Sequence, residues 1–186
     1  MPDLSTARAA SLPAALLAAT SGITAAPPMA RFILRGLDAV APAGAALGLS
    51  IPTRPLTSAT AGDRSALWLG PDEFLLLAPA ADTAILQAQL TTALTGTACA
   101  LVDVSHRQTA LQLDGPASAA MLNSGVPLDL SLKAFPVGMV ARTIFDKAEI
   151  VLWRRDTNSF HIEVWRSFAP YVLAMLNHAM PLTHRS

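Results

Sequence analysis

The sequence is short of charge and of aromatic side chains. Charged residues make up 14% of its 186 residues and aromatic residues 5%, whereas apolar residues reach 52%. Soluble domains usually carry about 25% charged residues, so this chain has little charge with which to cover its surface. Two readings fit the deficit: an alanine-rich composition, or an apolar surface that a partner protein buries.

Cysteine is nearly absent as well, because Cys99 is the only one in the chain. A single cysteine excludes an intrachain disulfide and a CxxC metal or redox motif. Its apolar surroundings are typical of core packing, and we assign it no role. The stretch 12–19 loosely imitates a signal peptide, but its apolar run is weak and Asp3 precedes it, so a cytoplasmic protein is expected rather than a secreted one.

Other partner classes lack their usual signals. The formal net charge is zero and the basic residues are scattered, so no nucleic acid partner is expected. Prolines and a glycine interrupt the uncharged stretch 9–30, which is therefore not expected to span a membrane. The glycines nowhere form a GxGxxG or GxxxxGK[ST] loop, so no nucleotide site is predicted.

An internal near-repeat organises the rest of the chain. Leu67–Trp68, a turn and an apolar run recur from Leu152–Trp153 onward, at a spacing of 85 or 86 residues. Gly70–Asp72 supplies turn chemistry in the first copy and Arg155–Asn158 in the second, which predicts two β-hairpins. Strands are expected around residues 65–77, 109–113, 139–153 and 159–165.

A helix is predicted after each hairpin. Asp82 is expected to cap the first helix and Ser167 the second, and Pro170 falls in the first turn, where a missing N–H is tolerated. Helical spacing places apolar stripes on both helices, which are expected to be buried. The diagnostic members of these stripes are Leu86, Leu90, Val172 and Met175.

These elements predict an α+β fold, a single domain of two β-hairpin-plus-helix units. The domain is expected to cover residues 29–180. A flexible or weakly helical N-terminal tail, residues 1–28, with a short helix around 12–20, precedes it, and a C-terminal tail, residues 181–186, follows it.

A break in strand alternation is expected between Asp103 and Gln108, because apolar residues on its two sides have opposite parity. Asp103, Ser105 and His106 are the residue types of a hydrolytic triad, but neighbours on an extended chain point apart and cannot align. We expect Asp103 and Ser105 to bond backbone groups around the bend. His106 and Arg107 are then left to reach a neighbouring surface.

Trp165–Arg166 combines two residue types that are enriched in binding hot spots. Tryptophans beside hairpins can stack a planar ligand such as folate or flavin, but core or subunit contacts are the commoner use. We predict no catalytic, cofactor-binding or metal-binding residue in this chain. The predicted subunit-interface residues are His106, Arg107, Trp165 and Arg166.

Five segments, in this order, resemble the sarcosine oxidase gamma family, and the likeness runs from about Ala30 to Ala179. They are WLGPDE at 68–73, VDVSHR at 102–107, FPVG at 135–138, KAEI at 147–150 and EVWRSFA at 163–169. An Asp-x-Ser segment followed by a strand, Gly115-Pro116 and a helix is also similar to the folate-binding domain of glycine-cleavage aminomethyltransferases. That wider resemblance implies a related α+β fold.

The family resemblance implies a non-catalytic accessory subunit of a heterotetrameric enzyme. That enzyme oxidatively demethylates sarcosine to glycine, with peroxide and, when tetrahydrofolate is present, methylenetetrahydrofolate as products. The resemblance implies alpha, beta and delta partner subunits, and it places FAD, FMN, NAD and zinc in them. The alternative is an independent folate-binding or aminomethyltransferase-like protein, in which Asp103 is the candidate carboxylate for orienting the pterin.

Overall fold

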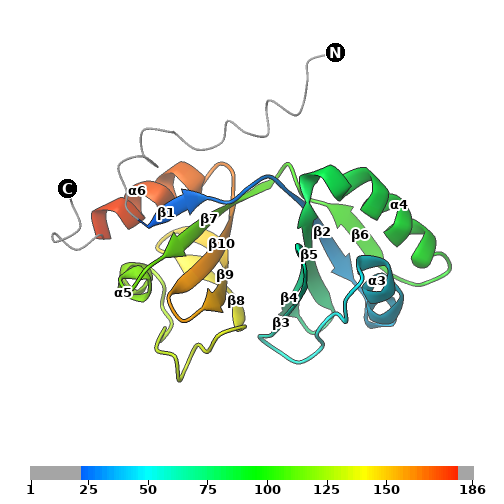
Figure 1. Cartoon of the computed structure of the whole chain (residues 1–186), viewed down its shortest axis with the longest axis horizontal. Helices are drawn as coiled ribbons and strands as arrows, with labels where there is room; N and C mark the ends of the chain where they lie inside the picture. Colours follow the sequence, from blue (N-terminus) through cyan, green and yellow to red (C-terminus); the bar gives the residue numbers. More distant parts are fainter. Residues whose placement is uncertain (1–21, 180–186) are drawn as a thin grey trace, which may run out of the picture. The chain divides into compact units, whose positions relative to one another are not determined.

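Two antiparallel sheets, each covered by helices, form the part of the chain that the structure describes (Figure 1). The structure, a computed structural model, describes residues 22–179. The helix expected around 12–20 and the C-terminal tail lie outside the described residues. The chain divides into two compact units, named here for their order along the sequence: the inner unit is the continuous segment Pro28–Ser105, and the outer unit is the flanking segments Met1–Pro27 and His106–Ser186.

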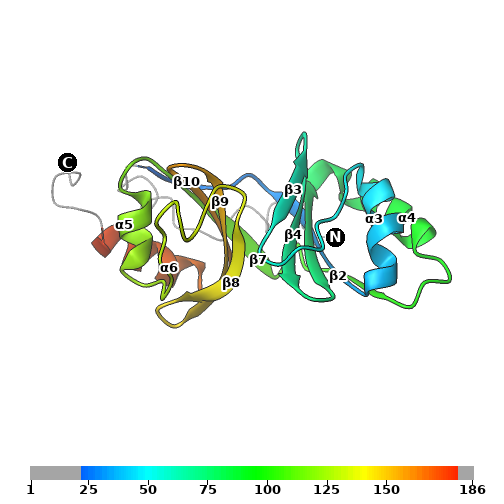
Figure 2. The same ribbon diagram turned by 90° about the horizontal axis from the view of Figure 1, so that it is seen from below.

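The inner unit holds a five-stranded sheet with the strand order β3-β4-β5-β2-β6. Figure 2 shows α3 and α4 on one face of this sheet. The strands are β2 Met29–Arg35, β3 Ser58–Ala61, β4 Arg64–Gly70, β5 Glu73–Pro79 and β6 Ala100–Asp103. The helical segments are η1 Leu37–Ala39, α3 Val40–Leu47, η2 Ala80–Asp82 and α4 Thr83–Ala93.

The outer unit holds a second five-stranded sheet with the order β1-β7-β10-β9-β8. Its strands are β1 Ile23–Ala25, β7 Gln108–Asp114, β8 Val140–Phe145, β9 Ala148–Asp156 and β10 Ser159–Trp165. Its helices are α5 Ser118–Asn123 and α6 Ala169–Ala179.

Strand alternation sends one row of apolar side chains toward the helices in each unit. In the inner unit Phe32 and Phe74 pack with Leu86 and Leu90 of α4. In the outer unit alternate residues of β10 pack with Val172, Leu173 and Leu176 of α6. Each unit therefore has its own hydrophobic core between a sheet face and two helices.

The α+β class and the repeated hairpin-plus-helix are confirmed. β4 and β5 form the first hairpin and α4 follows it, while β9 and β10 form the second and α6 follows it. The predicted break is also present, since β6 ends at Asp103 and β7 begins at Gln108. Leu86, Leu90 and Val172 are fully buried, whereas Met175 is half-buried at the margin of its core.

The two predicted helix caps differ in outcome. Asp82 occupies the N-cap position of α4, as predicted, but its side chain makes no cap bond. Its Oδ2 accepts from the Arg64 guanidinium at 2.9 Å, because a charge-assisted bond outcompetes a local cap. The last helix begins at Ala169, so Phe168 rather than Ser167 precedes it, and Phe168 O accepts the first helical bond, from Val172 N–H.

Two boundaries also differ from the sequence predictions. Ile23–Ala25, expected to belong to a tail, forms β1 and pairs with Leu111–Leu113 of β7. Arg155 and Asp156, expected in the second hairpin turn, are the last residues of β9. The turn itself is therefore only Thr157–Asn158, the length typical of tight hairpins.

Candidate interaction surface

Hydrogen bonds to the side chains of Asp103 and Ser105 fix the bend that follows β6. Asp103 Oδ1 accepts from Ser105 N–H at 2.8 Å. Ser105 Oγ in turn accepts from Arg31 N–H at 2.8 Å, inside the inner unit. Both side chains satisfy backbone donors, as predicted, so the arrangement is that of a stabilised turn and not of a nucleophile with its base.

Beyond the bend, the register of the outer sheet brings Arg107 beside Trp165. Trp165 pairs with Gln108 at the end of β10, and Arg166 N–H donates to Arg107 O at 3.0 Å. The guanidinium carbon of Arg107 lies 5.1 Å from the centre of the Trp165 ring. This distance is that of a cation–π contact, worth about 0.5–1 kcal/mol at an exposed site.

The surface around this contact is open. Trp165 is 40% exposed and Phe168, which follows it in the turn before α6, is 41% exposed. His106 and Arg107 are exposed and Arg166 is half-exposed. We call His106, Arg107, Trp165 and Arg166 the Arg–Trp surface; the structure gathers onto one end of the outer sheet two segments that are far apart in sequence.

The other two tryptophans are less exposed. Trp153 is only 7% exposed and lies edge-on to the His161 ring, with ring centres 5.8 Å apart. Trp68 is half-buried and packs against the inner core. Trp165 is therefore the most exposed of the three tryptophans, and tryptophan is a residue type enriched in binding hot spots.

A buried polar pair on β10 is a feature that the sequence analysis did not identify. His161 Nε2 and Glu163 Oε1 are 2.8 Å apart, and the two side chains are 2% and 0% exposed. The alternation of β10 was the available signal, since residues two apart on a strand share a face. The same face carries Trp153, which pairs directly with His161.

Arg154 is a second buried charged group, only 2% exposed. Its guanidinium donates to Phe135 O at 2.8 Å and to Leu130 O at 2.7 Å, and lies 4.5 Å from the centre of the Phe160 ring. Burial lowers the pKa of Arg154. These contacts tie the long connection between α5 and β8 to the sheet.

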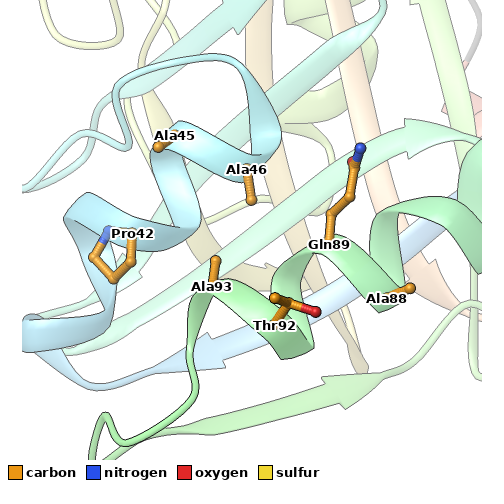
Figure 3. A pocket seen from close by; sticks show the side chains of 7 residues that line it. All are labelled: Pro42, Ala45, Ala46, Ala88, Gln89, Thr92 and Ala93. Carbon is orange, nitrogen blue, oxygen red and sulfur yellow. The ribbon is translucent and has the colours of Figure 1, made fainter.

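Two hollows lie on the inner unit. A shallow groove of about 730 Å³ runs between α3 and α4, and Figure 3 shows the side chains of both helices that line it, all of them short except Gln89. A smaller pocket, of about 310 Å³, lies between α4 and the end of the sheet, with Asp103 in its wall. The groove is lined by Pro42, Ala45, Ala46, Ala88, Gln89, Thr92 and Ala93.

The smaller pocket fits a whole folate poorly. Its volume of about 310 Å³ is at the lower end of the range of roughly 300–1,000 Å³ that ligand pockets span. Asp103, the candidate pterin carboxylate, is an exposed residue, and its Oδ1 already holds Ser105 N–H. A carboxylate that orients a ring by hydrogen bonds works best when it is shielded from water, so this site does not provide that setting.

Within residues 22–179, no three His, Cys, Asp or Glu side chains come close enough to hold a metal ion together. None of the helices in the same range is both long and apolar enough to cross a membrane.

The fold defines an α+β protein with two antiparallel sheets, and the Arg–Trp surface on the outer unit is its candidate contact site. The same architecture occurs in the glycine cleavage system aminomethyltransferase T from Bartonella henselae, with a TM-score of 0.66, 18% identity, and coverage of 83% of this chain and 45% of that one. A stronger match is a chain of the heterotetrameric sarcosine oxidase from Corynebacterium sp. U-96. There the TM-score is 0.81 and the identity 29%, over 89% of each chain.

The sequence comparisons agree with this structural match. The model of the sarcosine oxidase, gamma subunit family matches residues 36–181. Sarcosine oxidase subunit gamma from Corynebacterium sp. (strain P-1) is 33% identical over 136 residues, and that from Arthrobacter sp. is 34% identical over 137 residues. Both alignments cover 73% of this chain and 66% of the relative, slightly under two thirds of its length. The chain belongs to the sarcosine oxidase gamma subunit family.

Proposed function

We propose that this chain is a non-catalytic accessory subunit of a heterotetrameric sarcosine oxidase. The observation that carries the proposal is the match, over 89% of both chains, to a chain of a heterotetrameric sarcosine oxidase. The complex demethylates sarcosine oxidatively to glycine, forming peroxide and, with tetrahydrofolate, methylenetetrahydrofolate. Alpha, beta and delta subunits are the partners, and FAD, FMN, NAD and zinc belong to them.

The chemistry of the described residues supports a contact role for this chain. Asp103 and Ser105, which together with His106 include the residue types of a hydrolase, are engaged with backbone groups. Catalysis by a side chain needs a reactive group positioned against a substrate, and these two are positioned against the chain itself.

The Arg–Trp surface supplies the main contact in this proposal. The Trp165 ring fills a pocket on a partner subunit, and the Arg107 guanidinium above it adds a fork of hydrogen-bond donors that matches a carboxylate. Aromatic and arginine anchors of this kind dominate the affinity of protein interfaces. Phe168, 41% exposed beside Trp165, extends the apolar area that a partner buries.

Co-expression tests this proposal. An affinity-tagged full-length chain is produced with the alpha, beta and delta subunits of the same organism, purified and washed with salt. Retention of flavin-bearing partners at equal stoichiometry is expected. A folded chain that is recovered without them contradicts the proposed function, and so does sarcosine oxidation by the isolated chain.

A further inference from the structure

The last strand of the inner sheet has an open edge. β6 lies at the end of the strand order and pairs on one side with β2. Val104 N–H donates to Arg31 O at 2.8 Å. Because hydrogen-bonded residues alternate along an antiparallel ladder, the backbone N–H and C=O of Val102 also face β2. Leu101 and Asp103 therefore direct their N–H and C=O groups outward, where no strand of residues 22–179 pairs with them.

Several common protections against added strands are absent from this edge. Natural proteins blunt open edges with short strands, charged side chains, proline, bulges or a covering helix. β6, with the sequence Ala-Leu-Val-Asp, is short and ends in a charged residue, but it carries no lysine or proline, and Val102 in its centre is 51% exposed. An exposed apolar edge of this kind is expected to be covered when the protein is in its working state.

Leu101 and Asp103, whose backbone groups face outward, also line the smaller pocket. Leu101 pairs with Leu34 and Asp103 pairs with Phe32, and both partners face the core beneath the helices. Paired residues share a face, so Leu101 and Asp103 project toward α4 as well. The pocket of about 310 Å³ is lined by Phe32, Gln87, Thr91, Leu94, Thr97, Cys99, Leu101 and Asp103.

The chemistry of the pocket selects for a positive charge. Asp103 Oδ1 accepts from Ser105 N–H, and among the described residues Asp103 has no cationic partner. Gln87, Thr91 and Thr97 add uncharged polar atoms, while Phe32 and Leu94 provide an apolar floor. A lysine or arginine side chain matches both parts, because its stem is apolar and its end is cationic.

We propose that β6 receives an extended segment of a partner polypeptide as a sixth strand, with a basic side chain of that segment seated in the pocket against Asp103. The added strand bonds to the outward N–H and C=O groups of Leu101 and Asp103. The residues of the added strand that lie opposite Leu101 and Asp103 have their side chains on the same face of the sheet as these two, toward the pocket. Main-chain bonds supply affinity and the pocket supplies selectivity. Identification of the partner as another oxidase subunit rests on the proposed function.

The first experiment compares amide hydrogen exchange in the free full-length chain and in the co-expressed complex. Exchange of the Leu101 and Asp103 amides is expected to slow at least about tenfold in the complex, because both become hydrogen-bonded. A complex that forms while these amides exchange at the free rate overturns the proposal and leaves the proposed function intact.

Matched variants test the charge. Asp103→Asn keeps an oxygen for Ser105 N–H but removes the carboxylate, and is expected to weaken association about tenfold. Asp129→Asn is the control, since Asp129 Oδ1 accepts from Ser131 N–H at the same 2.8 Å in an exposed turn of the outer unit. Equal effects of the two substitutions contradict the role of Asp103.

A second pair tests the location. Thr91→Trp fills the pocket and is expected to block association, whereas Thr92→Trp, on the adjacent α3–α4 groove, is expected to leave it unchanged. Both positions are exposed on α4, so both variants are expected to fold. If Thr92→Trp blocks association and Thr91→Trp does not, the contact lies at the groove and the proposal is contradicted.

If no complex forms, the proposed function fails. A synthetic peptide added to the free chain then tests whether β6 accepts an added strand. The probe is an acetylated and amidated heptapeptide of alternating valine and lysine, with a valine–glutamate peptide as its control. The lysine peptide is expected to shift the Leu101 and Asp103 amide resonances, and the glutamate peptide is not. In that case, absence of shifts at millimolar peptide, or equal shifts with both peptides, overturns the proposal.

Discussion

Replacing Arg154 by methionine is expected to destabilise the chain by about 2–4 kcal/mol. Its guanidinium donates to the carbonyl oxygens of Phe135 and Leu130 at 2.8 and 2.7 Å. A hydrogen bond to a charged group contributes about 1.5–3 kcal/mol, so the two together contribute roughly 3–6 kcal/mol. Burial of the charge, seen in the lowered pKa of Arg154, offsets part of this gain. Methionine retains most of the packing against Phe160 but leaves both carbonyls without their donor.

Urea unfolding measures this difference, and amide exchange across 126–139 shows whether the connection between α5 and β8 loosens first. The control is Arg155→Met on the same strand. Arg155 is exposed and its guanidinium lies 5.3 Å from the Trp153 ring, a contact worth about 0.5–1 kcal/mol. Equal stability of the Arg154 and Arg155 variants, or a loss below about 0.5 kcal/mol for Arg154→Met, refutes this reasoning.

Three further predictions concern single groups. The Asp146 carboxylate accepts a hydrogen bond from Tyr171, which raises the Tyr171 pKa above 10.0. Tyr171→Phe should therefore lower the free energy of unfolding at neutral pH, and the difference from the wild type should shrink as the pH rises through the raised pKa. Urea unfolding at a series of pH values measures this; a difference that does not change with pH argues against the bond. Ser105→Ala strands the buried Arg31 N–H and should cost about 1–3 kcal/mol in thermal unfolding, whereas Ser131→Ala, exposed, should change little. Calorimetry of the isolated chain with tetrahydrofolate should detect no tight binding; a saturable heat that Asp103→Ala removes favours the folate-binding alternative.

The hairpins and the two longer helices could be predicted because their signals are local. Gly70–Asp72 supplies turn chemistry between two apolar runs, and α4 and α6 carry apolar residues at helical spacing. The break after Asp103 was equally readable, since a strand cannot change its buried face without an irregularity.

The features that were missed depend on residues distant in sequence. β1 has three residues and exists through its pairing with β7, about ninety positions later, so no local pattern marks it. The cap at Asp82 failed because the carboxylate binds Arg64 instead. Residue type alone identified Arg107 and Trp165 as contact candidates, but their stacking follows from the β7–β10 register, which sequence spacing does not specify.

The most direct test of the account is the composition of the complex recovered with a tagged Trp165→Ala chain. Truncating a buried hot-spot aromatic costs about 2 kcal/mol or more, roughly thirtyfold in affinity. Co-expressed with alpha, beta and delta subunits, the wild-type chain should retain all three after a salt wash. The folded Trp165→Ala chain should lose most of them, and Ile85→Ala, a control at a 62% exposed position of the inner unit, should not. Recovery of the partners at wild-type yield with Trp165→Ala contradicts the proposed contact surface, and a wild-type chain that binds no partner contradicts its role as a subunit.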